Sequence, residues 1–381
     1  AIALICALRF SFFLATYQHD QNLIIDPDTL SYLHISTAMF ERGKYERVPG
    51  SAELHRPPGY PSFLVAHYAL FGKDRLIAPV ISQNLLTFLI ALMVAWLAFQ
   101  FGGGPAAALA AGLYLTDFTS FYYANEVLSE TLFTFVLLGA LVCMRKTIDS
   151  QPIAPGWLLV SGLVLTLAVF VRPVGLFLIY PSAALLGLYA YLAVRRPGPG
   201  LKAAGIFILP WVLLAGAWYL RSWAVSGVFT FTSYETGVFD QRLAAVFVFG
   251  EGVDYQTGIR MAQVPLAQGA TALQAFFSII LEYPWDYLKA TLIDMGRLLL
   301  SPAQWHLKSY FPNLFADQFP IEGLVLSGRF GEIAAQAARR PGAYLPVVFL
   351  VFLHLALVYA GLILSAVAIW KRPFPDKFYF L

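Results

Sequence analysis

Eight apolar stretches that carry almost no charge constrain this chain more than any other feature of its sequence. A helix needs about 20 apolar residues to cross the roughly 30 Å hydrocarbon layer of a bilayer. Stretches near that length lie at about residues 1–16, 77–100, 104–122, 127–144, 157–172, 174–194, 203–222 and 343–370. Charged residues make up only 12% of the chain, against about 25% in soluble proteins. The sequence therefore predicts an all-α polytopic membrane protein with at least eight transmembrane helices.

Charge, cysteine usage and motifs exclude several other classes of protein. A net charge of +3 does not indicate nucleic-acid binding. Cys6 and Cys143 both lie inside apolar stretches, so we expect neither a disulfide nor a zinc site from them. The lack of a P-loop argues against an ATP-driven transporter. Ala1 lies inside an apolar stretch and the final "KFYFL" resembles the start of another span, so we expect the sequence to be part of a longer chain.

Three short basic loops predict the orientation of the spans. Positive charges lie in "RKTIDSQPIAPG", in "RRPGPGLK" and in "KRPFPDK", the last with Lys371, Arg372 and Lys377. Alternating spans place all three loops on one side, which an excess of Lys and Arg marks as cytoplasmic. Two long connections, residues 17–76 and 223–342, then fall on the non-cytoplasmic side.

This topology predicts three parts. They are an N-terminal membrane module (1–222) that contains the first outer loop (17–76), a large non-cytoplasmic loop (223–342), and a C-terminal span with the start of a further part (343–381). Residues 272–299 of the large loop have amphipathic helical spacing. This spacing fits a juxtamembrane helix on the membrane surface as well as a core helix of an outer domain.

Five carboxylates converge on the predicted non-cytoplasmic side: Asp26, Asp28, Asp117, Glu126 and Glu130. Asp28 precedes a predicted helix that stops near Gly43, so it is a good helix N-cap and Asp26 could simply be solvated. Glu126 and Glu130 lie one helical turn apart at the start of the fourth predicted span. Carboxylates at the start of an apolar span are costly and usually functional, which favours a role beyond capping.

The order of motifs along residues 26 to about 300 resembles the membrane glycosyltransferases of the GT-C superfamily, in particular the protein O-mannosyltransferase and aminoarabinose transferase group. The matching residues are Asp28, Tyr32 and Gly43; Arg56-Pro57-Pro58; Glu130 in "LSETLF"; Arg172-Pro173; and Pro210-Trp211, Arg221, Gly227, Ser233 and Gly237. The chain departs from the group's pattern at Thr29, where many members have Glu, and at His55, where Glu is common in the aminoarabinose transferases.

The resemblance implies a GT-C-like helical bundle that transfers a sugar, hexose or pentose, from a polyprenyl-phosphate donor to a lipid, glycan or protein acceptor. Asp28 occupies the position of the general base, and Glu130 would orient the acceptor or assist the base; an ion pair between Glu130 and a nearby arginine is the alternative. Arg56 would hold the donor phosphate, because the guanidinium fork matches phosphate oxygens. Arg172 would be a second phosphate contact or an interfacial anchor. Tyr32, Tyr60 and Glu126 complete the expected substrate-binding residues.

A metal site is a further hypothesis. Asp26 and Asp28 form a D-x-D pair, as in metal-dependent oligosaccharyl transferases, and with His55 or His34 they could hold a divalent ion. A lone histidine in an outer loop is more often solvated. Metal dependence is therefore left open, and no other cofactor is expected.

Alternatives of other classes remain at this stage. They are a lipid or polysaccharide flippase or transporter, a catalytically inactive GT-C-like scaffold subunit, and a polysaccharide polymerase or ligase. Transporters of this kind carry charged residues in mid-span and broken helices in paired repeats, whereas here the polar groups cluster in outer loops. We expect a multi-pass plasma or bacterial inner membrane protein whose site faces the periplasm or exterior.

Overall fold

The computed structural model describes residues 1–150, 152–270, 272–300, 304–311, 331–332, 335, 338–339, 342 and 344–370. The described chain is almost entirely α-helical and forms two compact units, residues 1–231 with 356–381, and residues 232–355. Lys371, Arg372 and Lys377, on which part of the predicted orientation rests, lie outside the described residues. The predicted three-part division stays a prediction.

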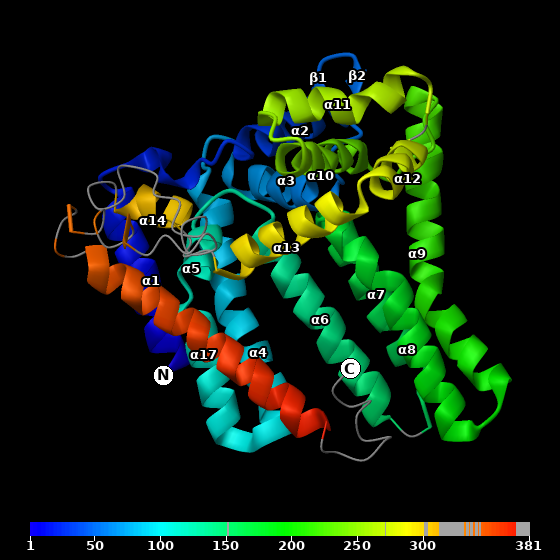
Figure 1. Ribbon diagram of the computed structural model, residues 1–381. Helices are drawn as coiled ribbons and strands as arrows, with labels where there is room; N and C mark the ends of the chain where they lie inside the picture. Colours follow the sequence, from blue (N-terminus) through cyan, green and yellow to red (C-terminus); the bar gives the residue numbers. More distant parts are fainter. Residues whose placement is uncertain are drawn as a thin grey trace. The chain divides into compact units, whose positions relative to one another are not determined.

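The first unit contains the helices that resemble membrane spans (Figure 1). Its elements are α1 (Ile2–Tyr17), η1 (Gln21–Ile24), α2 (Thr29–Arg42), β1 (Glu46–Val48), β2 (Ser51–Ala52), α3 (Gly59–Phe71), α4 (Ile77–Thr116), α5 (Phe118–Ala124), α6 (Glu130–Asp149), α7 (Pro155–Val171), η2 (Pro173–Gly175), α8 (Leu176–Val194) and α9 (Pro197–Ser226). Helix α17 (Tyr344–Trp370) runs from the second unit into the first. β1 and β2 form an antiparallel hairpin.

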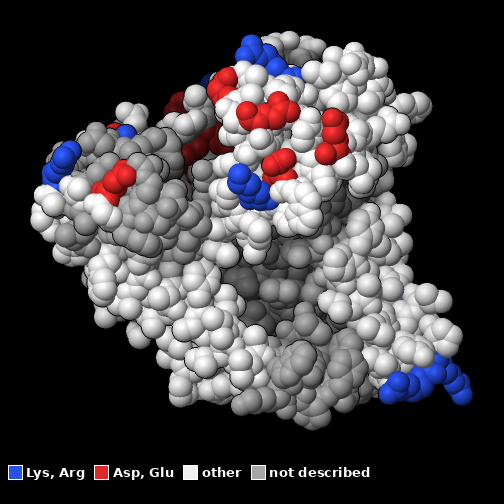
Figure 2. All heavy atoms as spheres, viewed as in Figure 1, with Lys and Arg blue, Asp and Glu red and all other residues white. Residues whose placement is uncertain are grey.

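Five helical segments among the described residues are long and apolar enough to cross a membrane: Ile77–Thr116, Glu130–Asp149, Pro173–Val194, Pro197–Ser226 and Pro346–Val367. The protein is therefore a multi-pass membrane protein. α1 and α7 are apolar but shorter. All eight predicted stretches fall on helices, and the number of spans stays a prediction. In Figure 2 the visible surface over α8 and α9 is mostly uncharged, with Lys and Arg colouring at the turn between these two helices.

Helix α4 contains two of the predicted spans. They follow each other without a loop and are separated only by a kink in the middle of the helix. Gly102 and Gly103 have non-helical backbone angles, and Gly103 has φ 63° and ψ −155°. Only glycine adopts this combination without strain. The break lies in "FGGGP", between the predicted stretches 77–100 and 104–122. The third predicted span, 104–122, is shorter than expected, since α4 ends at Thr116 and Asp117 caps the separate helix α5.

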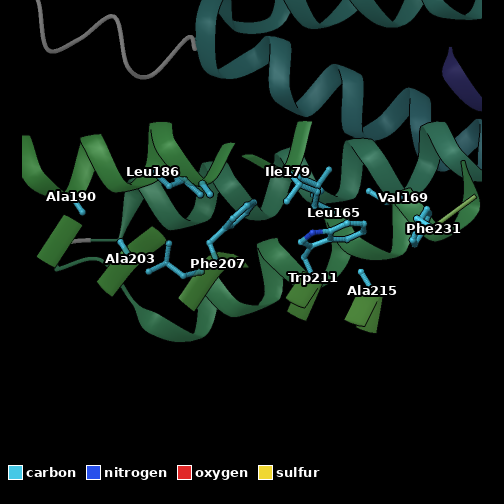
Figure 3. Close-up of a cluster of buried hydrophobic side chains, with 13 residues drawn as sticks. Leu165, Val169, Ile179, Leu186, Ala190, Ala203, Phe207, Trp211, Ala215 and Phe231 are labelled. Atoms are coloured by element: carbon cyan, nitrogen blue, oxygen red, sulfur yellow. The ribbon is translucent and has the colours of Figure 1, made fainter. Parts of the chain in front are cut away.

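The core of the first unit lies among α6, α7, α8 and α9 (Figure 3). Phe207 and Trp211 of α9 are buried against Leu165 and Val169 of α7 and Ile179 of α8. Gly162 of α7 lies directly against the backbone of Phe207. Small residues at such crossings let membrane helices approach closely, where dispersion contacts drive association. This packing fixes the ends of α7 and α9, which carry two of the arginines considered below.

The second unit contains α10 (Tyr234–Gly250), α11 (Tyr255–Ala267), α12 (Ala272–Glu282), α13 (Pro284–Leu300) and α14 (Gln304–Tyr310). Leu243, Val246, Phe247, Ala262 and Ile279 form its buried cluster. The amphipathic helix predicted over 272–299 is in fact two helices, since Pro284 lacks the N–H needed to continue α12. α13 leaves an apolar stripe exposed, made of Trp285, Leu288, Leu292, Met295 and Leu299.

Candidate active site

The start of helix α2 is built by Asp26 rather than by Asp28. The Asp26 carboxylate accepts the Asp28 N–H at 2.9 Å, and the Asp26 N–H donates to the Thr29 hydroxyl at 3.0 Å. Asp28 occupies the N-cap position, but its carboxylate makes no capping hydrogen bond. Instead it pairs with Arg56 (2.9 Å between Oδ1 and Nη2), while its side chain stays 65% exposed. The Asp28 carboxylate therefore does not cap helix α2.

Two segments about 100 residues apart are joined next to this turn. The Val127 N–H donates to the Ile24 carbonyl at 3.0 Å, and the Thr29 hydroxyl donates to the Val127 carbonyl at 3.1 Å. On the other side, the Gln83 side-chain amide of α4 donates to the Glu126 carbonyl at 2.6 Å. The start of α2 and the start of α6 are held side by side by these bonds.

The loop before α3 presents Arg56. The buried Glu53 carboxylate accepts the backbone N–H groups of His55 and Arg56, at 2.5 and 2.9 Å. The Tyr45 hydroxyl donates to the Arg56 carbonyl at 2.5 Å. The Arg56 guanidinium lies over the Tyr32 ring, 4.6 Å from its centroid, and its side chain is only 13% exposed. Stacking and burial of this kind suit arginine in a partly desolvated site.

Two arginines approach one pair of hydroxyls. The Tyr32 and Ser129 hydroxyls are 2.9 Å apart. Arg56 donates to Tyr32 at 3.2 Å, and Arg172 donates to Ser129 at 3.5 Å. Arg172 also forms an ion pair with Glu130. The structure thus brings Asp28, Arg56, Tyr32, Glu130 and Arg172 into one continuous network, in which each arginine has a carboxylate partner.

Tyr60 and Glu126, also predicted to bind substrate, are buried beside this network. Tyr60 is fully buried, its hydroxyl donates to Gln83 at 2.8 Å, and its ring meets Tyr32 edge-on at 4.9 Å between centroids. Glu126 is 2% exposed, and burial raises the pKa of its carboxyl to about 8, helped by the negative charges of Asp26 and Glu130. The Tyr122 hydroxyl contacts Glu126 and lies 3.2 Å from Asp26 Oδ2. Tyr60 therefore packs against Tyr32 of the network, and Glu126 is connected to Asp26 through Tyr122.

The predicted metal ligands do not come together. Among the described residues, no three His, Cys, Asp or Glu side chains are grouped so as to hold a metal ion. Asp26 is engaged by its own turn and by Tyr122, and Asp28 by Arg56. Burial, followed by the positive charge of Arg56, lowers the pKa of His55. The residues present do not fit a divalent ion here.

Sequence reasoning did not identify Ser129, Gln83 or Asn84. Ser129 links the two arginine pairs, and the two amides of α4 bind the segment 123–126, Asn84 through Asn125 at 2.9 Å. A signal for the amides was present, because "SQNLL" places two of them inside an apolar stretch. Polar side chains inside a span usually have a specific partner. Nothing comparable distinguishes Ser129.

The fold and the site define a multi-pass membrane protein with a cluster of paired arginines and carboxylates beside the ends of its spans. No protein-family model matches the chain, and no curated protein matches it. Among solved structures, the chain is similar to ArnT from Cupriavidus metallidurans, whose crystal structure is bound to undecaprenyl phosphate. The identity is 17% and the TM-score 0.46, over all of this chain and 74% of that chain. A likeness at this level does not assign a function.

Proposed function

We propose that this protein is a glycosyltransferase that moves a sugar from a polyprenyl-phosphate donor to a hydroxyl of a lipid, glycan or protein acceptor, on the non-cytoplasmic side of the membrane. The observation that carries the proposal is the meeting of Arg56 and Arg172 on the Tyr32–Ser129 hydroxyl pair, next to an exposed carboxylate. The order of motifs described above, from Asp28 to Arg221, supports the same conclusion.

The two arginines form the proposed phosphate site. Arg56 is mostly buried and Arg172 partly buried, and each donates an N–H to one hydroxyl of the pair, Arg56 to Tyr32 and Arg172 to Ser129. A phosphate there would receive charge-assisted hydrogen bonds from both sides, which are stronger than bonds between neutral groups. The same cations would neutralise the negative charge that develops when the bond between the sugar and the phosphate oxygen breaks.

Asp28 is the proposed general base. Its carboxylate is exposed and reaches Arg56 at 2.9 Å, so it lies next to the proposed phosphate. A phosphate that takes over Arg56 would release Asp28 from the ion pair. The free carboxylate would accept the proton of the acceptor hydroxyl while the oxygen of that hydroxyl attacks the anomeric carbon of the sugar. The polyprenyl phosphate would leave with the electrons of the broken C–O bond.

Glu130 and the tyrosines have supporting roles in this proposal. Glu130 holds Arg172 and, released in the same way, would orient the acceptor. Tyr32 presents Arg56 by ring stacking and by its hydroxyl. Tyr60 supports the Tyr32 ring, and Glu126 contacts Tyr122 behind the turn at Asp26. Contact with substrate is thus assigned to Arg56, Arg172, Asp28, Glu130 and Tyr32.

Donor binding tests the proposal directly. Purified protein in nanodiscs should bind undecaprenyl phosphate more tightly than undecaprenol of the same length, and Arg56→Ala should weaken that binding by about tenfold or more, since a charge-assisted contact is lost. Arg145→Ala is the matched control, because Arg145 pairs with Asp149 within α6. Equal affinity for the phosphate and the alcohol would contradict the proposal.

A further inference from the structure

Arg221, near the end of helix α9, makes a set of contacts that the proposed chemistry does not use. Its Nη1 donates to the Glu53 carbonyl at 2.7 Å and its Nη2 to the Tyr45 carbonyl at 3.3 Å. The guanidinium also lies over two rings, 5.1 Å from the centroid of Tyr45 and 4.9 Å from that of Trp218. One side chain therefore joins a membrane helix to a loop 168 positions earlier in the chain.

The two carbonyls that Arg221 binds flank the β1–β2 hairpin. Tyr45 directly precedes β1 and Glu53 directly follows β2. The Glu53 N–H also bonds the Tyr45 carbonyl, at 3.4 Å. Arg221 thus closes the base of the hairpin at both strands. A hairpin of two very short strands is only marginally stable by itself, so this closure supplies order that the strands lack.

The residues fixed at the base of the hairpin are those that hold Arg56. The Tyr45 hydroxyl donates to the Arg56 carbonyl, and the Glu53 carboxylate accepts the Arg56 N–H. Both backbone groups of Arg56 are therefore bound by residues whose own carbonyls are bound by Arg221. The Trp218 indole N–H donates to the Phe231 carbonyl at 2.9 Å, which fixes the second ring of the stack.

We propose that Arg221 is a positioning residue for Arg56: it clamps the base of the β1–β2 hairpin so that Tyr45 and Glu53 hold the Arg56 backbone with its guanidinium directed at Asp28 and Tyr32. The clamp sets the phosphate site before the donor arrives. Pre-organisation of this kind increases affinity, because the loop need not be ordered on binding. The inference rests on the proposed function for its effect on donor binding, but the clamp itself is independent of that function.

A double-mutant cycle on undecaprenyl phosphate binding separates a positioning role from a general structural one. Arg221→Ala should weaken binding by about tenfold, the scale of a lost pair of charged hydrogen bonds. Because Arg221 acts through Arg56, adding Arg221→Ala to Arg56→Ala should cause little further loss. Tyr45→Phe, which removes one link and keeps the ring, should give a smaller loss of the same kind. Arg145→Ala should leave binding unchanged. Additive losses in the double variant would overturn the proposal.

Amide hydrogen exchange tests the clamp without any ligand. In Arg221→Ala, amides of the segment 45–56 should exchange at least about tenfold faster than in the wild type, because their local opening becomes easier. Arg56→Ala and Arg145→Ala should leave most of this segment protected. Unchanged exchange in Arg221→Ala would overturn the clamp. Faster exchange, with no preference of the wild type for the phosphate lipid, would instead contradict the proposed function and leave the clamp in place.

Discussion

The hydroxyls of Tyr32 and Ser129 lie 2.9 Å apart although the residues are 97 positions apart in the chain. Arg56 donates to the first hydroxyl and Arg172 contacts the second. The pair therefore lies between the guanidinium groups of Arg56 and Arg172. Their carboxylate partners, Asp28 and Glu130, are the candidates for proton transfer and acceptor binding. The hydroxyl pair connects the two arginine–carboxylate pairs of the proposed site.

Removing the Ser129 hydroxyl should weaken the binding of a polyprenyl phosphate. Ser129→Ala leaves the Tyr32 hydroxyl and Arg172 without a shared partner, and bonds to charged groups are worth about 1.5–3 kcal/mol. We expect a loss of about tenfold in donor affinity, measured by titration in nanodiscs. Thr116→Ala, at an exposed threonine that bonds within its own helix, is the control. Wild-type affinity in Ser129→Ala would show that the hydroxyl pair does not organise the site.

Stability should depend on pH through Glu126. The folded protein holds the pKa of this carboxyl near 8, whereas an unfolded glutamate has a pKa of about 4.3. Between these values the folded state binds more protons than the unfolded state, so this contribution to stability is complete below about pH 4.3 and is lost as pH rises to about 8. Each pKa unit is worth about 1.36 kcal/mol, so the effect amounts to a few kcal/mol.

Glu126→Gln tests this dependence, because the amide imitates the neutral acid. The melting temperature of the variant should decline less than that of the wild type between pH 5 and pH 9, with most of the difference present at the alkaline end. The measurement is a thermal denaturation series in detergent. Parallel curves for the two proteins across this range would show that Glu126 is ionised in the folded state.

Close packing at Gly59 should be required for the position of Arg56. A Cβ at this residue would lie 2.6 Å from the carbonyl oxygen of Phe170 in α7, so Gly59→Ala must push α3 away from α7. Overpacking of this kind costs about 1–3 kcal/mol, and we expect both a lower melting temperature and weaker donor binding. Gly112→Ala, inside α4, where a Cβ meets no atom within 4 Å, should lower neither. Equal behaviour of the two variants would contradict the tight α3–α7 contact.

The predicted orientation can be tested by labelling. Cysteines introduced at Ser51, in the hairpin, and at Lys202, at the start of α9, are both at exposed positions and should react with a membrane-impermeant reagent from opposite sides. Protein with Cys6 and Cys143 replaced gives the background. Labelling of both sites from one side would overturn the topology and the non-cytoplasmic assignment of the site.

The sequence predicted the apolar helices and pointed to the charged residues that the structure brings together, because these signals are local. Apolar stretches give helices directly, and Asp28 and Arg56 stand out by motif order. An ion pair of Glu130 with a nearby arginine was among the predicted alternatives and is present with Arg172, but the other partners of these residues could not be predicted. Ser129 and Arg221 make contacts with residues 97 and 168 positions away in the chain, and such contacts follow from tertiary packing. Pro284 could have indicated the break between α12 and α13, but the amphipathic pattern continues across it and predicted a single helix.

The central claim, that Asp28 accepts the proton of the acceptor, is tested most directly by the turnover of Asp28→Asn. Asparagine keeps the shape of the side chain but cannot take up a proton at neutral pH. In a transfer assay with purified protein and a polyprenyl-phosphate sugar, turnover should fall by roughly 10²-fold or more, the usual scale for general acid–base help, while donor binding, which depends on Arg56, should not weaken. Asparagine is also nearly as good a helix cap as aspartate. Turnover close to that of the wild type would therefore contradict the catalytic role of Asp28.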